Sequence, residues 1–249
     1  MKVISLINLK GGVGKTSSTV NIATVFALMG FSVLILDTDK QSNSTQYLGR
    51  YDEEMKSMYH VFTGQCSLKE IIRETDINGL HIAPATIELV RVRDKHLEGA
   101  YNALSGQIDT LGYDYVFIDC PPDLNPIVDN ALAASTDVLV PIKIDNWALL
   151  GFGYLMERIQ EIRQEFNPQL RFAGAFITMD KARTNVSKEA KKHLMEHLGN
   201  ELFKTCVRDN STLVTSTFYE KPVVIYDKSS NSAKDYYTLS NEIFQKIKV

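Results

Sequence analysis

Lys15 and Thr16 end a glycine-rich segment, Lys10–Ser17, which reads KGGVGKTS. Glycines allow the backbone to turn tightly enough to point several N–H groups at one anion. A lysine there can reach the β- and γ-phosphates of a nucleotide, and a threonine hydroxyl suits a magnesium ion that keeps most of its waters. We therefore predict a site for a nucleoside triphosphate and Mg²⁺. The predicted phosphate-binding residues are Lys10, Gly11, Gly12, Val13, Gly14, Lys15, Thr16 and Ser17.

Three aspartates follow or end apolar segments that read as buried strands. Asp37 and Asp39 come after Ser32–Leu36, and Asp119 ends Tyr115–Asp119. The carboxyl ends of parallel strands meet at one edge of a sheet, where ligands bind. We predict that Asp119 holds magnesium through a water and that Asp39 orients or activates the attacking water. The predicted metal site is thus Thr16, Asp39 and Asp119, while Asp37 supports either the metal shell or its loop.

Apolar runs and amphipathic stretches alternate along the whole chain. Strands are expected at Val3–Ile7, Ser32–Leu36, Leu80–Ala83, Tyr115–Asp119, Val138–Ile142, Phe172–Thr178, Leu202–Val207 and Val223–Ile225. Helices are expected at Ser18–Phe31, Thr45–Leu48, Met55–Phe62, Leu68–Arg73, Arg91–Leu111, Asn125–Ala134, Leu149–Phe166, Val186–Leu198 and Ser232–Ile247. This order predicts one α/β domain over residues 1–249, with a mostly parallel twisted sheet covered by helices on both faces.

The composition narrows the class of protein further. The net charge of −3 gives no overall attraction to nucleic acid, so any such binding needs a local patch. No run approaches the roughly 20 apolar residues of a membrane span. Because Met1 leads directly into a strand, we expect neither a signal peptide nor an N-terminal DNA-binding arm. Three widely spaced cysteines, Cys66, Cys120 and Cys206, indicate a reducing cytoplasm.

The motifs together resemble those of the ParA/MinD family of dimerising ATPases. Its deviant phosphate-binding loop has a second lysine, here Lys10, while Leu9 stands where the strict pattern has glycine. Its Asp-x-Asp-Pro-Gln motif matches Asp37–Gln41 with Lys40 in place of proline, and its Asp-x-Pro-Pro motif matches Asp119–Pro122. The resemblance extends over essentially the full length and is closest to ParA-type partitioning proteins.

This resemblance implies a switch driven by ATP and Mg²⁺. In the family the extra lysine, Lys10 here, reaches the phosphates of the other subunit, so ATP binding and homodimer formation are one event. Lys10, Lys15 and Asp39 would be the catalytic residues. Family segments near the adenine correspond to Thr178, Met179 and Arg208. The resemblance also implies slow hydrolysis stimulated by a ParB-like centromere-binding protein, and a cytoplasmic, nucleoid-associated location.

ParA-type dimers bind DNA without sequence preference, through its phosphates. The basic residues available for such contacts are Lys188, Lys191 and Lys192 on one expected helix, and Lys221 and Lys228 further along the chain. The alternative, that these are ordinary solvated lysines, remains open. We expect at least one cluster to contact DNA.

Other functions are compatible with parts of this sequence. A MinD-like, membrane-associated regulator would use Ser232–Ile247 as an amphipathic anchor, but packing against the sheet is the simpler prediction for that helix. A metabolic or metal-cluster ATPase of the same fold is a further alternative, and the lack of a cysteine pair counts against the cluster-carrying form. His193 and His197 match a zinc-peptidase spacing, which needs a third ligand.

Overall fold

The strands form one seven-stranded sheet in the order β3-β4-β2-β5-β1-β6-β7. This computed structural model describes residues 1–92, 104–144, 148–181 and 185–248. Neighbouring strands run parallel except for the antiparallel pair β3–β4. The strands are β1 (Lys2–Leu6), β2 (Val33–Asp37), β3 (Arg73–Glu74), β4 (Leu80–Ala83), β5 (Tyr115–Asp119), β6 (Asp137–Lys143) and β7 (Arg171–Thr178).

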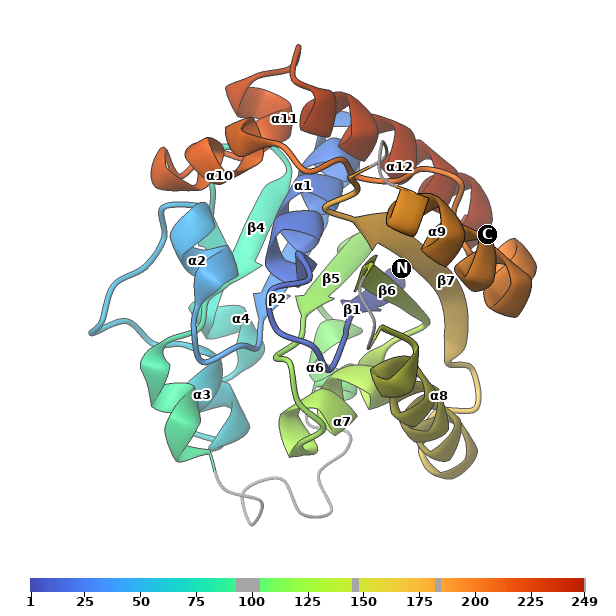
Figure 1. Ribbon diagram of the computed structural model, residues 1–249. Coiled ribbons are helices and arrows are strands. Elements are labelled where there is room, and N and C mark those ends of the chain that lie inside the picture. Colours follow the sequence, from blue (N-terminus) through green and yellow to red (C-terminus); the bar gives the residue numbers. More distant parts are fainter. Residues whose placement is uncertain (93–103, 145–147, 182–184, 249) are drawn as a thin grey trace.

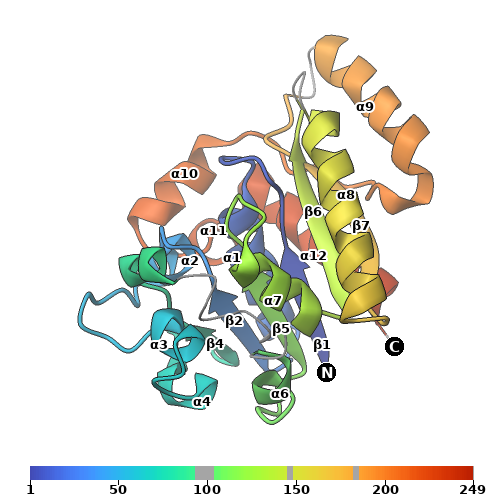
Figure 2. The same cartoon turned by 90° about the horizontal axis from the view of Figure 1, so that it is seen from below.

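Helices lie on both faces of the sheet, as two perpendicular views show (Figure 1, Figure 2). The described α-helices are α1 (Lys15–Leu28), α2 (Asn43–Tyr47), α3 (Met58–Phe62), α4 (Leu68–Ile71), α6 (Ser105–Ile108), α7 (Pro126–Ala134), α8 (Ala148–Glu165), α9 (Asn185–Leu198), α10 (Ser211–Phe218), α11 (Val223–Tyr226) and α12 (Asn231–Ile247). Two short 3-10 helices are η1 (Ile87–Arg91) and η2 (Gly199–Glu201). The predicted α/β architecture is therefore confirmed.

Alternate residues of each central strand enter two separate apolar cores. On β2, Leu34 and Leu36 belong to one core, and Val33 and Ile35 belong to the other. Helices α3, α4, α7, α8 and α9 close the first core, and α1, α11 and α12 close the second. Because both faces are buried, the central strands read as continuous apolar runs, and that is why the sequence reveals them.

Two predicted strands are wrong. Val223–Ile225 lies in the single-turn helix α11, which follows Pro222. The backbone N–H of Val224 donates to Asn21 Oδ1 of α1 at 3.2 Å, so a tertiary contact favours the turn over the strand that three β-branched residues would otherwise prefer. Leu202–Val207 is an irregular segment with only isolated bridge pairing.

Two helical regions also differ from expectation. Most of the predicted helix Arg91–Leu111 lies outside the described residues; the described parts hold the end of η1 and the short α6. Helix α10 is unexpected, because its serines and threonines favour turns as readily as helices. It begins where Asn210 accepts a hydrogen bond from the backbone of Thr212 at 2.9 Å.

The C-terminal helix packs as predicted. Its apolar residues Tyr236, Leu239, Ile243 and Ile247 are buried in the second core. The hydroxyl of Tyr236 lies 3.2 Å from Ser18 Oγ on α1, which fixes the two helices against each other. Within the described part of the chain, no helix has the length and apolar character needed to cross a bilayer.

Both edges of the sheet are poorly suited to pairing with a further strand. At one edge, β3 is only two residues long, antiparallel, and carries exposed charged side chains. At the other edge, the irregular segment after η2 lies alongside β7. The N–H of Phe203 donates to the carbonyl of Ala175 at 2.8 Å, and the N–H of Val207 donates to the carbonyl of Ile177 at 2.8 Å. The carboxyl ends of the central strands thus remain as the side of the sheet from which the functional loops extend (Figure 1).

Candidate active site

The glycine-rich loop turns directly into helix α1. Gly12 and Gly14 have left-handed backbone angles, φ 69° and 82°, which a side chain would strain. Gly14 is the N-cap, so the helix begins at Lys15, earlier than the predicted start at Ser18. The N–H groups and the positive dipole of a helix N-terminus favour an anion, so this geometry fits the predicted phosphate-binding role of the loop between β1 and α1.

Lys15 lies folded over its own loop. Its ammonium donates to the backbone carbonyls of Asn8 at 2.9 Å and Lys10 at 3.0 Å. Burial lowers the pKa of Lys15, and the charges of Asp119 and Asp39 oppose that shift. A buried ammonium held beside anion-binding amides is an effective partner for phosphate oxygens.

Asn8 is a loop residue that sequence reasoning missed. Its side-chain Oδ1 accepts from the N–H of Lys10 at 2.9 Å, and its Nδ2 donates to the carbonyl of Pro141 on β6 at 2.8 Å. These bonds hold the start of the loop against the neighbouring strand. The available signal was the tendency of asparagine to bond to the backbone two residues ahead in turns.

Thr178, which is predicted to lie near the adenine, contacts the phosphate loop from β7. Its hydroxyl donates to the carbonyl of Val13 at 2.7 Å, and the side chain is 2% exposed. Its Cβ also lies 3.7 Å from where a Cβ on Gly14 would stand. The hydroxyl of Thr178 is thus bonded to the phosphate loop, and base contacts stay a prediction for Thr178, Met179 and Arg208.

Met179 and Arg208 are brought together at the end of β7. Met179 has a left-handed φ of 49°, and the next residue, Asp180, forms a bridge with Arg208. The guanidinium of Arg208 makes a two-pronged ion pair with Asp235 of α12, at 2.8 and 2.6 Å. The hydrogen bonds to Asp235 raise the pKa of Arg208. Helix α12 therefore holds Arg208 in the region where we predict the adenine base to bind.

Asp37 and Asp119 lie opposite each other on neighbouring strands β2 and β5. Both carboxyl groups are fully buried. Burial raises the pKa of Asp119 to about 6, while burial and the charge of Asp119 raise the pKa of Asp37 to about 8. In the described part of the chain, neither carboxylate forms an ion pair with lysine or arginine.

Asp37 holds the loop that follows β2. Its Oδ2 accepts from the N–H and the hydroxyl of Thr45 at 2.9 and 2.7 Å, and its Oδ1 accepts from the N–H of Asp39 at 3.2 Å. Of the two roles that the sequence left open for Asp37, support of the loop is the one with direct contacts.

Asp39 lies at the same end of the sheet and is 7% exposed. Its Oδ1 accepts from the N–H of Gln41 at 2.9 Å. The charge of Asp39 raises the pKa of both Lys15 and Asp119, so the three groups lie in the same part of the site. This juxtaposition agrees with a water-orienting role.

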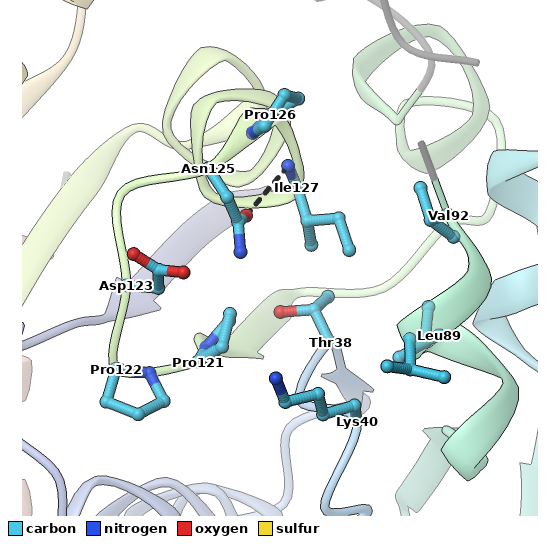
Figure 3. A pocket seen from close by; sticks show the side chains of 11 residues that line it. Thr38, Lys40, Leu89, Val92, Pro121, Pro122, Asp123, Asn125, Pro126 and Ile127 are labelled. Carbon is cyan, nitrogen blue, oxygen red and sulfur yellow. Dashed lines mark hydrogen bonds between the residues drawn. The ribbon is translucent and has the colours of Figure 1, made fainter. Parts of the chain in front are cut away.

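A pocket of about 250 Å³ lies between the loop after β2 and the segment after β5 (Figure 3). Thr38 and Lys40 line it from the loop after β2, and Lys40 stands where the related motif has proline. Its other lining residues are Leu89, Val90, Val92, Pro121, Pro122, Asp123, Asn125, Pro126 and Ile127. No residue of Lys10–Ser17 lines it, so this pocket is a neighbour of the phosphate loop and not part of it.

The residues at the carboxyl end of β5 fit magnesium. Thr16 lies close enough to the carboxylate of Asp119 to lower its pKa, so two hard oxygen donors are near each other beside the phosphate loop. Mg²⁺ in nucleotide sites is bound by one or two such ligands, waters and substrate phosphates, so this sparse donor set suits it.

The lysines considered for DNA differ in their surroundings. The ammonium of Lys191 is 2.5 Å from the carboxylate of Asp180, whose side chain is 3% exposed. Lys191 therefore holds α9 to the segment after β7 and is a poor candidate for a DNA contact. The exposed candidates are Lys188, Lys192, Lys221 and Lys228.

Within the described residues, His193 and His197 have no third side chain that could complete a zinc site. His193 lies 3.5 Å from Glu196, and His197 Nδ1 is 2.8 Å from the carbonyl of His193. Over residues 1–92, 104–144, 148–181 and 185–248, no group of three His, Cys, Asp or Glu side chains could hold a metal. Nothing described here favours zinc.

Known proteins share this arrangement. Residues 1–172 match the family AAA_31, an AAA domain. The chain is 35% identical to the chromosome-partitioning ATPase Soj of Thermus thermophilus, over 98% of this chain and 96% of that protein. It is 30% identical to the chromosome partitioning protein ParA of Caulobacter vibrioides, over 99% of this chain and 95% of the relative.

A solved structure agrees with the fold. Cobyrinic acid a,c-diamide synthase from Mycobacterium smegmatis, with bound ADP and magnesium, superimposes with a TM-score of 0.84 at 26% identity, covering 96% of this chain and 92% of that one. Three observations point to the same family: the glycine-rich loop, the aspartates at the strand ends, and the full-length similarity to Soj and ParA. The chain belongs to the Soj/ParA family of chromosome-partitioning ATPases.

Proposed function

We propose that this protein is a cytoplasmic, nucleoid-associated switch that dimerises on binding ATP and Mg²⁺ and partitions plasmids or chromosomes. The observation that carries the proposal is the meeting of Lys15, Thr16 and Asp119 beside a loop with two left-handed glycines. The similarity to partitioning ATPases over the whole chain supports the biological role.

Each residue of the site has a separate role in ATP hydrolysis. Lys15 and the loop amides bind the β- and γ-phosphates, and Thr16 and Asp119 hold magnesium. When bound, the metal neutralises charge on the phosphates. Asp39 orients the attacking water, and Lys10 of the second subunit stabilises the charge that develops on the phosphoryl oxygens. In the single chain Lys10 is half-buried, with its N–H bonded to Asn8.

The experiment that best tests this function is DNA binding measured without nucleotide, with ADP and with ATP. Binding should need ATP, be independent of sequence, and weaken steeply with salt because phosphate contacts release counterions. Equal binding in all three states would contradict a nucleotide-gated DNA switch. A parallel co-sedimentation with liposomes covers the MinD-like alternative, which the buried apolar face of α12 does not favour.

The Lys10→Ala variant should bind ATP but fail to dimerise. Removing one partner of a buried, hydrogen-bonded charge pair costs about 2–5 kcal/mol, which should weaken the dimer by roughly 30-fold or more. Sedimentation with a non-hydrolysable ATP analogue measures the dimer, and calorimetry measures ATP affinity. Lys69→Ala removes an exposed lysine of α4 and is the matched control. A normal dimer of Lys10→Ala would refute the role of Lys10.

Charge reversal should locate the DNA contact. Lys188 and Lys192 lie on α9, whereas Lys221 and Lys228 flank α11, and these elements are apart in both views (Figure 1, Figure 2). We therefore expect one of the double variants, Lys188→Glu/Lys192→Glu or Lys221→Glu/Lys228→Glu, to lose ATP-dependent DNA binding. Its salt slope should fall by about one for each phosphate contact removed.

Lys191 is left unchanged in these variants, because reversing it would break its ion pair with buried Asp180. Each variant should keep ATP-dependent dimerisation, which separates DNA binding from folding. Wild-type DNA binding by both double variants would exclude all four lysines.

Turnover should be slow for the protein alone and faster with a ParB-like centromere-binding protein. This part of the proposal rests on the family relationship. Phosphate release measured with and without that partner, in the presence of DNA, tests it.

A further inference from the structure

The short helix α2 carries two hydroxyls that hold the two buried carboxylates of the site. Ser44 Oγ donates to Asp119 Oδ2 at 2.8 Å, and Thr45 Oγ1 donates to Asp37 Oδ2 at 2.7 Å. Both hydroxyl side chains are fully buried. Serine and threonine near a helix start ordinarily bond to nearby backbone. Here they bond to strand residues instead, which indicates a role beyond starting the helix.

The bond from Ser44 sets the orientation of the Asp119 carboxylate. Oδ2 is directed to α2 by Ser44, while the other oxygen, Oδ1, lies 3.4 Å from Thr19 Oγ1 on α1. The N–H and the hydroxyl of Thr38 donate to the backbone carbonyl of Asp119 at 3.1 and 2.8 Å. Backbone and carboxylate are thus both fixed, with one oxygen directed to the helix that begins with Lys15 and Thr16.

Helix α2 is itself anchored by hydrogen bonds to two other parts of the fold. Thr45 Oγ1 accepts from the N–H of Ala85, after β4, at 3.0 Å. The hydroxyl of Tyr47 lies 2.7 Å from Ser216 Oγ on α10. A donor on such an anchored helix restricts carboxylate rotation more than a donor on a free loop would.

We propose that Ser44 is a positioning residue of the magnesium site, acting through Asp119. The inference rests on the proposed role of Asp119 as a magnesium-holding residue. Hydrogen-bonding partners that orient a metal-binding carboxylate typically contribute 10- to 100-fold to metal affinity. The hydroxyl of Ser44 would keep Oδ1 of Asp119 directed toward helix α1, which carries Thr16, the other predicted magnesium ligand, in its first turn.

The test is the Mg²⁺ dependence of nucleotide binding. Calorimetry gives the affinity for ADP and for a non-hydrolysable ATP analogue, in EDTA and across a Mg²⁺ titration. For Ser44→Ala we expect unchanged affinity in EDTA and a 10- to 100-fold higher Mg²⁺ requirement. Ser44→Gly also removes the hydroxyl and should behave alike, whereas Ser44→Thr keeps it and should restore the wild-type titration.

Ser240→Ala is the matched control. Ser240 is equally buried on α12, and its hydroxyl has no hydrogen-bond partner within the described residues. If Ser44→Ala and Ser44→Gly keep the wild-type Mg²⁺ requirement, Ser44 does not position the metal site. Equal loss of affinity with and without Mg²⁺ would show a structural role and also overturn the inference. A wild-type protein without Mg²⁺ dependence would instead refute the assignment of Asp119, and with it the proposed function of the site.

Discussion

Lys15→Ala should abolish useful ATP binding while leaving the fold intact. Losing a buried, charge-assisted contact costs about 3 kcal/mol, which is roughly a 100-fold loss of affinity. Because burial lowers the pKa of Lys15, the folded protein already disfavours its charged form. Removing this ammonium relieves that cost but also removes its hydrogen bonds to the carbonyls of Asn8 and Lys10, so we expect the free energy of unfolding of the nucleotide-free protein to change little.

Calorimetry measures the affinity for ATP, and unfolding by urea in the absence of nucleotide measures the stability of the fold. Lys15→Met is the matched control for volume, because it fills the same space without a charge. Both variants should bind ATP weakly and unfold close to the wild-type urea concentration. Wild-type affinity in Lys15→Met would show that the ammonium does not bind phosphate.

Asp39→Ala should bind ATP and remain a dimer, with hydrolysis lowered by at least about 100-fold, the usual scale for losing a positioned acid–base group. Binding should persist because the Asp39 carboxylate, close to Lys15, is not needed to hold the phosphates. The substitution also removes a negative charge from a site that must bind the negatively charged phosphates of ATP.

Single-turnover phosphate release and sedimentation of the ATP-loaded variant measure these effects. Asp39→Asn keeps an oxygen able to accept from the N–H of Gln41 but loses the charge, so it separates loop support from catalysis. If Asp39→Asn hydrolyses ATP normally and Asp39→Ala does not, Asp39 supports the loop and another group orients the water.

The central sheet and the phosphate loop were predictable from the sequence for definite physical reasons. The runs at β2 and β5 are continuously apolar because both of their faces are buried, and a loop that must point amides at an anion needs glycines. Gly12 and Gly14 indeed take left-handed angles. Asp37 and Asp119 were placed correctly at one sheet edge because parallel strands align their carboxyl ends.

What could not be predicted depends on partners distant in sequence. Nothing near Lys191 reveals that its ammonium meets a buried aspartate, and nothing near Thr178 reveals its bond to Val13. Likewise, Val223–Ile225 reads as a strand until Asn21 of α1 provides an acceptor for the turn. The orientation of Asp119 by Ser44 joins residues 75 positions apart.

The edges of the sheet affect how copies of this protein can assemble. The charged two-residue β3 and the irregular segment along β7 make poor templates for a strand from another molecule. Polymerisation by continuous β-pairing, of the kind that builds cross-β fibres, is therefore disfavoured at both edges of the sheet. We expect self-association to use loops and helices instead of sheet edges.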